Sequence, residues 1–188
     1  MKKYEFTGET VVIFGVTFNR IRALVRIKNE FFRVNPGELG GWIESEDNLS
    51  HEGNCWVCGD AEVYGDAKVC GNAWVGGNAR VYGDAEVCGN ARVGGYAMVC
   101  GNARVCGDAW IYKKNHSLVI GPIGSPNAHT TFFHSKNGDI KVVCGRFYGT
   151  IDEFSESVKT THSGSKYENV YNAAVNLAKI QIEACEEN

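Results

Sequence analysis

Six residues in the C-terminal part of the chain have types that suit the binding of a small anion. A loop rich in glycine and proline precedes a predicted strand, and a single arginine follows. Backbone N–H groups in such a loop can surround a phosphate, and a guanidinium can pair with it. An ordinary turn with a structural hairpin is the alternative interpretation. The residues predicted to bind a ligand are Gly121, Gly124, Ser125, His129, Thr131 and Arg146.

Histidines supply the candidates for general-base chemistry, and none is singled out by a motif. His116 and His129 are weak candidates because either could form a cleft with the flat face of the repeat. Cys144 and His162 could form a nucleophile and base, but the sequence offers no third group to orient them. Neither a GxxxxGKS nor a GxGxxG pattern is present, so nucleotide hydrolysis is not expected. We therefore predict no catalytic residue.

The middle of the chain repeats every six residues. From Val57 to Trp110 nine units follow one another without a slip, as in VCGDAE, VYGDAK and VCGNAW, and two looser units cover 45–56. An aliphatic residue first and a small residue fifth fit neither a helix nor a simple strand. The period is that of a solenoid in which Val and Ala point inward and Gly-Asp or Gly-Asn forms each corner. His51 falls at an inward position of a loose unit, where we expect a capping role.

These units resemble the hexapeptide repeat of the left-handed parallel β-helix family. Three units make one coil, so 45–116 gives about four coils. The run from Leu39 to Ala67 also resembles a bacterial and prophage group of such proteins, often labelled as transferases. The resemblance implies a homo-oligomer, with a trimer favoured, and acyl transfer from a coenzyme A thioester to an acceptor activated by a histidine. The regular repeats at 57–112 depart from those enzymes because they contain neither a histidine nor a loop insertion.

A coil of 18 residues predicts columns of side chains on the outer faces. One column carries indoles with a guanidinium between them, and a second carries two phenols. Such aromatic columns either pack under the ends of the chain, contact another subunit, or line a ligand groove. The residues predicted to form a subunit interface are Trp56, Trp74, Arg92, Trp110, Tyr64 and Tyr82.

Cysteines are numerous, and most occupy repeat positions. Cys70, Cys88 and Cys106 should stack, but a strand spacing of about 4.8 Å is long for two ligands about 2.3 Å from a zinc ion. Cys55 and Cys58 form a CxxC pattern, yet the repeat points the first inward and the second outward. We therefore predict no metal site and no cofactor, and we interpret the thiols as structural.

The chain divides into three predicted parts. An N-terminal β cap covers 1–44, the β-helix 45–112, and an α+β module 113–188. In the module, Asn137-Gly138 predicts a hairpin, and Thr150 with Glu153 predicts a capping box that begins a helix. The fold expected is therefore mainly β: a short left-handed parallel β-helix with a β cap and an α+β module.

Composition limits the function further. The 188 residues carry a net charge of −3 and no long apolar run, so we expect neither nucleic acid nor a membrane as partner. Eight cysteines without a secretory signal favour the cytoplasm. The function expected is a non-catalytic, oligomeric binding or scaffold protein. The resemblance makes a phage or prophage accessory role plausible, in which it sequesters a nucleotide-like ligand or blocks a host protein. The alternatives are a coenzyme A-dependent acyltransferase and a structural particle component.

Overall fold

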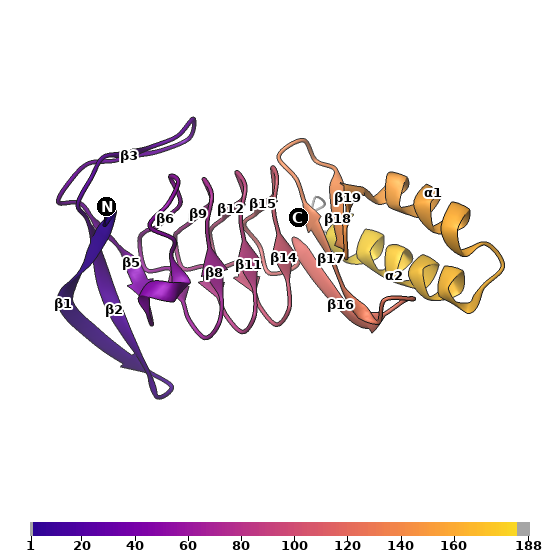
Figure 1. Cartoon of the computed structure of the whole chain (residues 1–188), viewed down its shortest axis with the longest axis horizontal. Coiled ribbons are helices and arrows are strands. Elements are labelled where there is room, and N and C mark those ends of the chain that lie inside the picture. Colours follow the sequence, from indigo (N-terminus) through magenta and orange to yellow (C-terminus); the bar gives the residue numbers. More distant parts are fainter. Residues whose placement is uncertain (1, 184–188) are drawn as a thin grey trace.

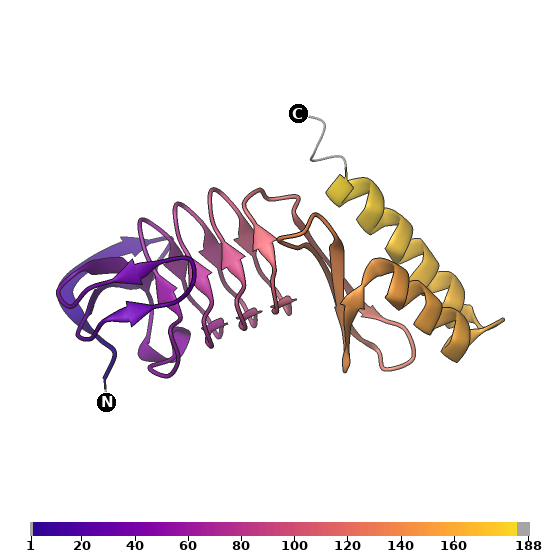
Figure 2. The same cartoon turned by 90° about the horizontal axis from the view of Figure 1, so that it is seen from above.

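The computed structural model describes residues 2–183, and it confirms the expected mainly β fold. A β-solenoid of about four turns forms the middle of an elongated molecule (Figure 1). β-Hairpins cover its N-terminal end. A four-stranded sheet closes the other end and carries a pair of helices on its far side, as Figure 2 shows.

Three parallel sheets, each two residues wide, form the faces of the solenoid. The first contains β7 (Glu62–Val63), β10 (Arg80–Val81) and β13 (Met98–Val99). The second contains β8 (Lys68–Val69), β11 (Glu86–Val87) and β14 (Arg104–Val105). The third contains β6 (Trp56–Val57), β9 (Trp74–Val75), β12 (Arg92–Val93) and β15 (Trp110–Ile111). Partners in register are 18 residues apart, as Val69 and Val87 are, so the predicted columns exist.

The interior of the solenoid is as narrow as the repeat predicts. The first and fifth residues of each regular unit point inward and are almost fully buried, as Val87 and Ala91 illustrate. Glycines form the corners with positive φ. At Gly89, where φ is +68°, a Cβ atom would lie 2.7 Å from the backbone nitrogen of Gly107 in the next coil. The close spacing of the coils therefore excludes a side chain there.

The first coil departs from the register that the sequence predicts. β5 (Leu39–Ile43) pairs in parallel with β7, so the solenoid begins on this face before residue 45. A short 3₁₀-helix, η1 (Glu46–Asn48), follows. Leu49 then pairs with Val69 and fills the inward position that the repeat assigned to His51. The expected inward placement of His51 is thus wrong, because this coil contains two more residues than the others.

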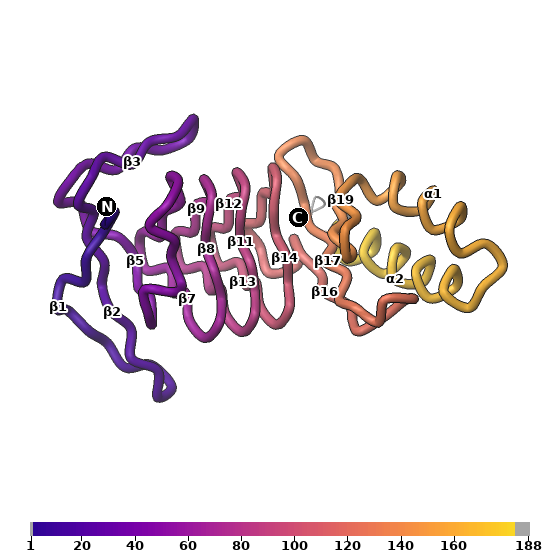
Figure 3. Tube along the Cα trace, in the orientation of Figure 1, coloured from indigo at the N-terminus to yellow at the C-terminus, as the bar shows by residue number. Residues whose placement is uncertain are grey.

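The N-terminal segment covers the open end of this first coil. The long hairpin of β1 (Tyr4–Ile13) and β2 (Val16–Ala23) continues the sheet of β5. A smaller hairpin of β3 (Ile27–Lys28) and β4 (Arg33–Val34) projects along the side of the coils (Figure 3). Buried Tyr4 donates a hydrogen bond of 2.8 Å from its hydroxyl to the Leu49 carbonyl, and this contact anchors the cap.

The C-terminal sheet has four antiparallel strands. They are β16 (Ser117–Ile123), β17 (Ala128–His134), β18 (Ile140–Cys144) and β19 (Phe147–Thr150). One face of this sheet completes the core of the solenoid through Phe133 and Val143. The other face packs against the helices through Phe132 and Val142. The sheet is therefore the lid of the solenoid and the floor of the helical module.

The two helices are α1 (Ile151–His162) and α2 (Lys166–Glu183). The predicted capping box is present, because Glu153 N donates to Thr150 Oγ1 at 3.1 Å and Thr150 N donates to the Glu153 carboxylate at 2.7 Å. Phe154 and Tyr171 pack edge to face between the helices. Within 2–183, no helix is long and apolar enough to span a membrane.

Candidate ligand site in the C-terminal module

An open cavity of about 360 Å³ lies where two turns of the sheet meet the helices. We call it the module cavity. The turn between β16 and β17 borders one side, the turn between β18 and β19 another, and α1 and α2 form the wall. The lining residues are Ser125, Pro126, Cys144, Gly145, Arg146, Phe147, Phe154, Ser157, Val158, Thr161, His162 and Tyr171.

Gly124 fixes the position of Ser125 at the edge of the module cavity. Its φ is +72°, and a Cβ atom here would overlap the hydroxyl of Tyr171. That hydroxyl accepts a hydrogen bond of 3.7 Å from the Cys144 thiol. Burial, followed by a hydrogen bond with Cys144, raises the pKa of Tyr171 well above its usual range. The tyrosine therefore stays neutral and ties α2 to Cys144 at the end of β18.

Cys144 and His162 both line the cavity, but they do not form a nucleophile and base. The sulfur of Cys144 accepts a hydrogen bond from Thr130 Oγ1 at 3.2 Å, and its thiol donates one to the Tyr171 hydroxyl at 3.7 Å. His162 instead places Nε2 at 3.4 Å from Ser125 Oγ. Its ring lies 5.6 Å from that of Tyr171. No carboxylate lines the described cavity to orient this histidine as a general base.

The charge and polarity of the cavity favour an anion with an apolar part. Arg146 is exposed in the turn and supplies the single fixed charge among the described lining residues. Phe147, Phe154 and Val158 provide apolar surface beside it, and Ser125 and His162 provide groups that donate hydrogen bonds. A guanidinium next to aromatic rings can bind a phosphate or carboxylate whose attached ring packs on the apolar wall.

The remaining residues of the predicted anion site lie elsewhere. Thr131 is 1% exposed and faces the solenoid, where its hydroxyl accepts a hydrogen bond of 3.0 Å from Arg104 N. Gly121 packs against His129 on the neighbouring strand, where a Cβ atom would lie 2.7 Å from His129 Cα. Neither residue, nor His129, lines the module cavity. Of the loop residues predicted to surround the anion, Gly121, Gly124 and Ser125, only Ser125 lines the described cavity.

His116, a candidate base for acyl transfer, lies at the junction of the solenoid and the sheet. Its Nδ1 accepts a hydrogen bond of 3.3 Å from Tyr112 N, and its ring lies 5.1 Å from that of His134. In the neutral ring, an Nδ1 that accepts leaves the proton on Nε2, which is then a donor. This environment does not favour His116 as a general base.

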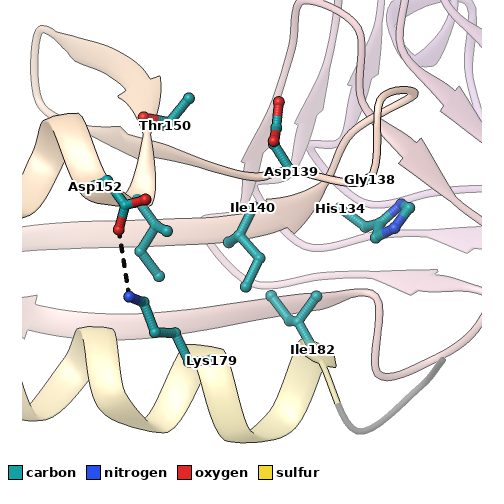
Figure 4. A pocket seen from close by; sticks show the side chains of 9 residues that line it. His134, Gly138, Asp139, Ile140, Thr150, Asp152, Lys179 and Ile182 are labelled. Carbon is teal, nitrogen blue, oxygen red and sulfur yellow. Dashed lines mark hydrogen bonds and ion pairs between the residues drawn. The ribbon is translucent and has the colours of Figure 1, made fainter. Parts of the chain in front are cut away.

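A second cavity, of about 420 Å³, lies on the other side of the module and has a different character (Figure 4). Asp139 and Asp152 line it, and Lys179 pairs with Asp152 at 3.3 Å. Ile140 and Ile182 form its apolar floor. The charge of Lys179 is therefore neutralised by Asp152, and Asp139 gives the cavity a net negative charge. An anion would bind poorly in this cavity.

The predicted subunit interface is largely covered by the chain itself. Trp56 is 1% exposed and lies beneath the N-terminal segment, with its ring 6.4 Å from that of Tyr4. It cannot contact another subunit, so this prediction is corrected. The guanidinium of Arg92 lies 5.5 and 5.4 Å from the rings of Trp74 and Trp110, and Phe31 of the small hairpin covers it at 4.8 Å.

The phenol column is partly covered as well. Tyr64 and Tyr82 stack with ring centroids 5.0 Å apart, as the 18-residue coil predicts. Phe18 of the N-terminal hairpin packs edge to face on Tyr64 at 5.4 Å. Of the alternatives for the aromatic columns, the structure shows packing beneath the N-terminal segment.

Sequence reasoning missed several residues that shape the module cavity. Phe147, Phe154, Ser157 and Thr161 were not among the predicted site residues. A usable signal existed for α1, because Phe154, Ser157 and Thr161 follow one another at helical spacing from the capping box.

The sequence matches no model of a known protein family, and no curated protein is significantly similar to it. Its function must therefore be argued from the residues of the cavity.

Proposed function

We propose that the chain is a non-catalytic binding protein whose module cavity holds a small anion carrying a ring, of the size of a nucleoside monophosphate. The observation that supports this most is the placement of Arg146 beside an apolar wall without a competing carboxylate. A cavity of about 360 Å³ lies at the lower end of the range for small-molecule sites, which fits one ring system and one phosphate.

The solenoid supports this proposal as a rigid carrier. Its interior is close-packed, and Phe133 and Val143 of the end sheet complete that core. Arg146 and the apolar wall supply groups that bind, and these groups support binding as the proposed role. A phage or prophage accessory role, with the ligand sequestered from the host, is the biological context that the sequence resemblance implies.

A titration of the full chain tests the proposal. Nucleoside monophosphates, cyclic mononucleotides, inorganic phosphate and acetyl-CoA would be titrated calorimetrically into the wild type, Arg146→Ala and Lys159→Ala. Lys159 is an exposed cation on α1 outside the cavity. We expect a monophosphate to bind about 10- to 100-fold more weakly to Arg146→Ala only, since hydrogen bonds to charged groups contribute about 1.5–3 kcal/mol. Binding of acetyl-CoA alone would favour the transferase alternative.

We also propose that the chain forms a homo-oligomer, with a trimer as the expected size. α2 supports this, because Val170, Ala173, Leu177 and Ile180 are exposed at intervals of three, four and three residues. This is the spacing of a coiled-coil seam. Light scattering after gel filtration should show that Leu177→Glu dissociates the oligomer, whereas Asn176→Glu on the neighbouring surface does not. Large assemblies without bound ligand would favour the structural particle component.

A further inference from the structure

Two thiols and a carboxylate converge on the second face of the solenoid. Cys70 follows β8 and Cys88 follows β11, while Glu86 begins β11. One ligand atom from each of these three residues lies within 4.8 Å of the others. We propose that Cys70, Glu86 and Cys88 form a binding site for Zn²⁺.

The pleat of the strand explains why the carboxylate joins the thiols. Val87 points inward, so Glu86 and Cys88 on either side of it both point outward. Parallel pairing places Cys70 directly beside Cys88 in the next coil. The 18-residue column contributes the thiols of Cys70 and Cys88, and the third ligand, Glu86, comes from the residue two positions before Cys88.

The backbone holds this arrangement rigidly. Cys70 N donates to the Val87 carbonyl at 2.9 Å, and Cys88 N donates to the Val105 carbonyl at 2.9 Å. With Zn–S bonds of about 2.3 Å, tetrahedral coordination needs sulfur atoms about 3.8 Å apart. The strands are about 4.8 Å apart. Rotation of the two cysteine side chains can bring their sulfur atoms to the shorter distance. Two thiolates and a carboxylate would leave a fourth position for water.

The proposed site is open to solvent on one side. A cavity of about 370 Å³ is lined by Cys70 and Glu86 and gives this access. Its lining also includes the carboxylate of Asp47, the ammonium of Lys68, and the carboxylate of Glu46, which pairs with Lys2 at 2.7 Å. Arg104 pairs with Oε2 of Glu86 at 3.4 Å, and this carboxylate can keep that pair through one oxygen while the other binds the metal.

Both thiols hold their protons at neutral pH. Burial, followed by the proximity of Cys88, raises the pKa of Cys70 to about 11. A hydrogen bond with Cys106, followed by burial, raises the pKa of Cys88 far above its usual range. A divalent cation between the sulfur atoms would replace these protons, so binding should release protons and weaken as the pH falls.

Cobalt substitution tests the site directly. The reduced full chain would be titrated anaerobically with Co²⁺ and then with Zn²⁺, and the variants Cys70→Ser, Cys88→Ser and Glu86→Gln would be compared. Cys100→Ser is the matched control, because Cys100 lies in the column of the stacked tyrosines. We expect one Co²⁺ per wild-type chain, with the near-ultraviolet charge-transfer band of a cobalt thiolate, displaced by one Zn²⁺.

The variants separate the proposal from nonspecific binding. Either serine variant at Cys70 or Cys88 should weaken Zn²⁺ binding at least about 100-fold, since even residues that only support metal ligands contribute about 10- to 100-fold. Glu86→Gln should weaken binding while the thiolate band persists, and Cys100→Ser should match the wild type. The proposal would be overturned if the wild type lacked the charge-transfer band. It would also be overturned if Cys70→Ser and Cys88→Ser bound Zn²⁺ as tightly as the wild type does.

Discussion

Gly124→Ala should lower the free energy of unfolding of the module. The loss should be larger than for a glycine-to-alanine substitution that introduces backbone strain without a steric clash. A residue with a Cβ atom in this left-handed region costs about 1–2 kcal/mol. The new methyl group would also displace the Tyr171 hydroxyl from the Cys144 thiol, which removes a hydrogen bond of about 0.5–1.5 kcal/mol. We expect a total loss of about 2–3 kcal/mol in the free energy of unfolding of the module.

Gly138→Ala is the matched control. Gly138 has φ of +87°, but its Cβ atom would meet nothing within 4 Å, so it carries the backbone cost without the clash. Denaturant unfolding followed by the helical circular dichroism signal suits the measurement, because both α-helices of the described chain lie in the module. Equal destabilisation by the two variants would refute the role of the Tyr171 contact. Tyr171→Phe, which loses only the hydroxyl, should cost about 1 kcal/mol.

Three further substitutions and conditions test other parts of the structure. Thr150→Ala removes the N-cap of α1 and should cost about 1 kcal/mol in the same unfolding assay; an unchanged midpoint would contradict the cap. Arg92→Ala loses contacts with three aromatic rings and should cost about 1–3 kcal/mol by tryptophan fluorescence, given about 0.5–1 kcal/mol for each exposed contact. The pKa of Cys70 is raised from 9.0 to about 11. The unfolded chain therefore loses this proton first, and stability should fall as the pH rises from 9 to 11. Cys70→Ser should remove that part of the pH dependence; a profile identical to that of the wild type would contradict the assignment.

The solenoid could be predicted from the sequence because its period imposes the fold locally. A small inward residue and a glycine corner recur in every unit, so burial, register and columns all follow from counting. Counting residues gave the wrong register for the first coil, because Leu49, and not His51, fills the inward position. The repeat is already irregular at residues 45–56, so two additional residues in this coil cannot be recognised from the sequence.

The candidate site could be predicted only in part. Thr130 and Thr131 alternate across one strand, and the sequence cannot say which face meets the solenoid and which meets the helices. Arg146 and Ser125 were identified because a turn presents them, whereas Phe154 reaches the cavity only through the packing of α1. Phe31 covers Arg92 through a tertiary contact that no local pattern reveals.

Hydrogen–deuterium exchange with and without a nucleoside monophosphate tests the central claim most directly. Binding in the module cavity should slow exchange in the turn at 124–127, in the turn at 144–147 and along 157–162, and Arg146→Ala should lose this protection at the same ligand concentration. Protection confined to the solenoid or the N-terminal hairpins, or protection that is equal in the wild type and Arg146→Ala, would contradict the account.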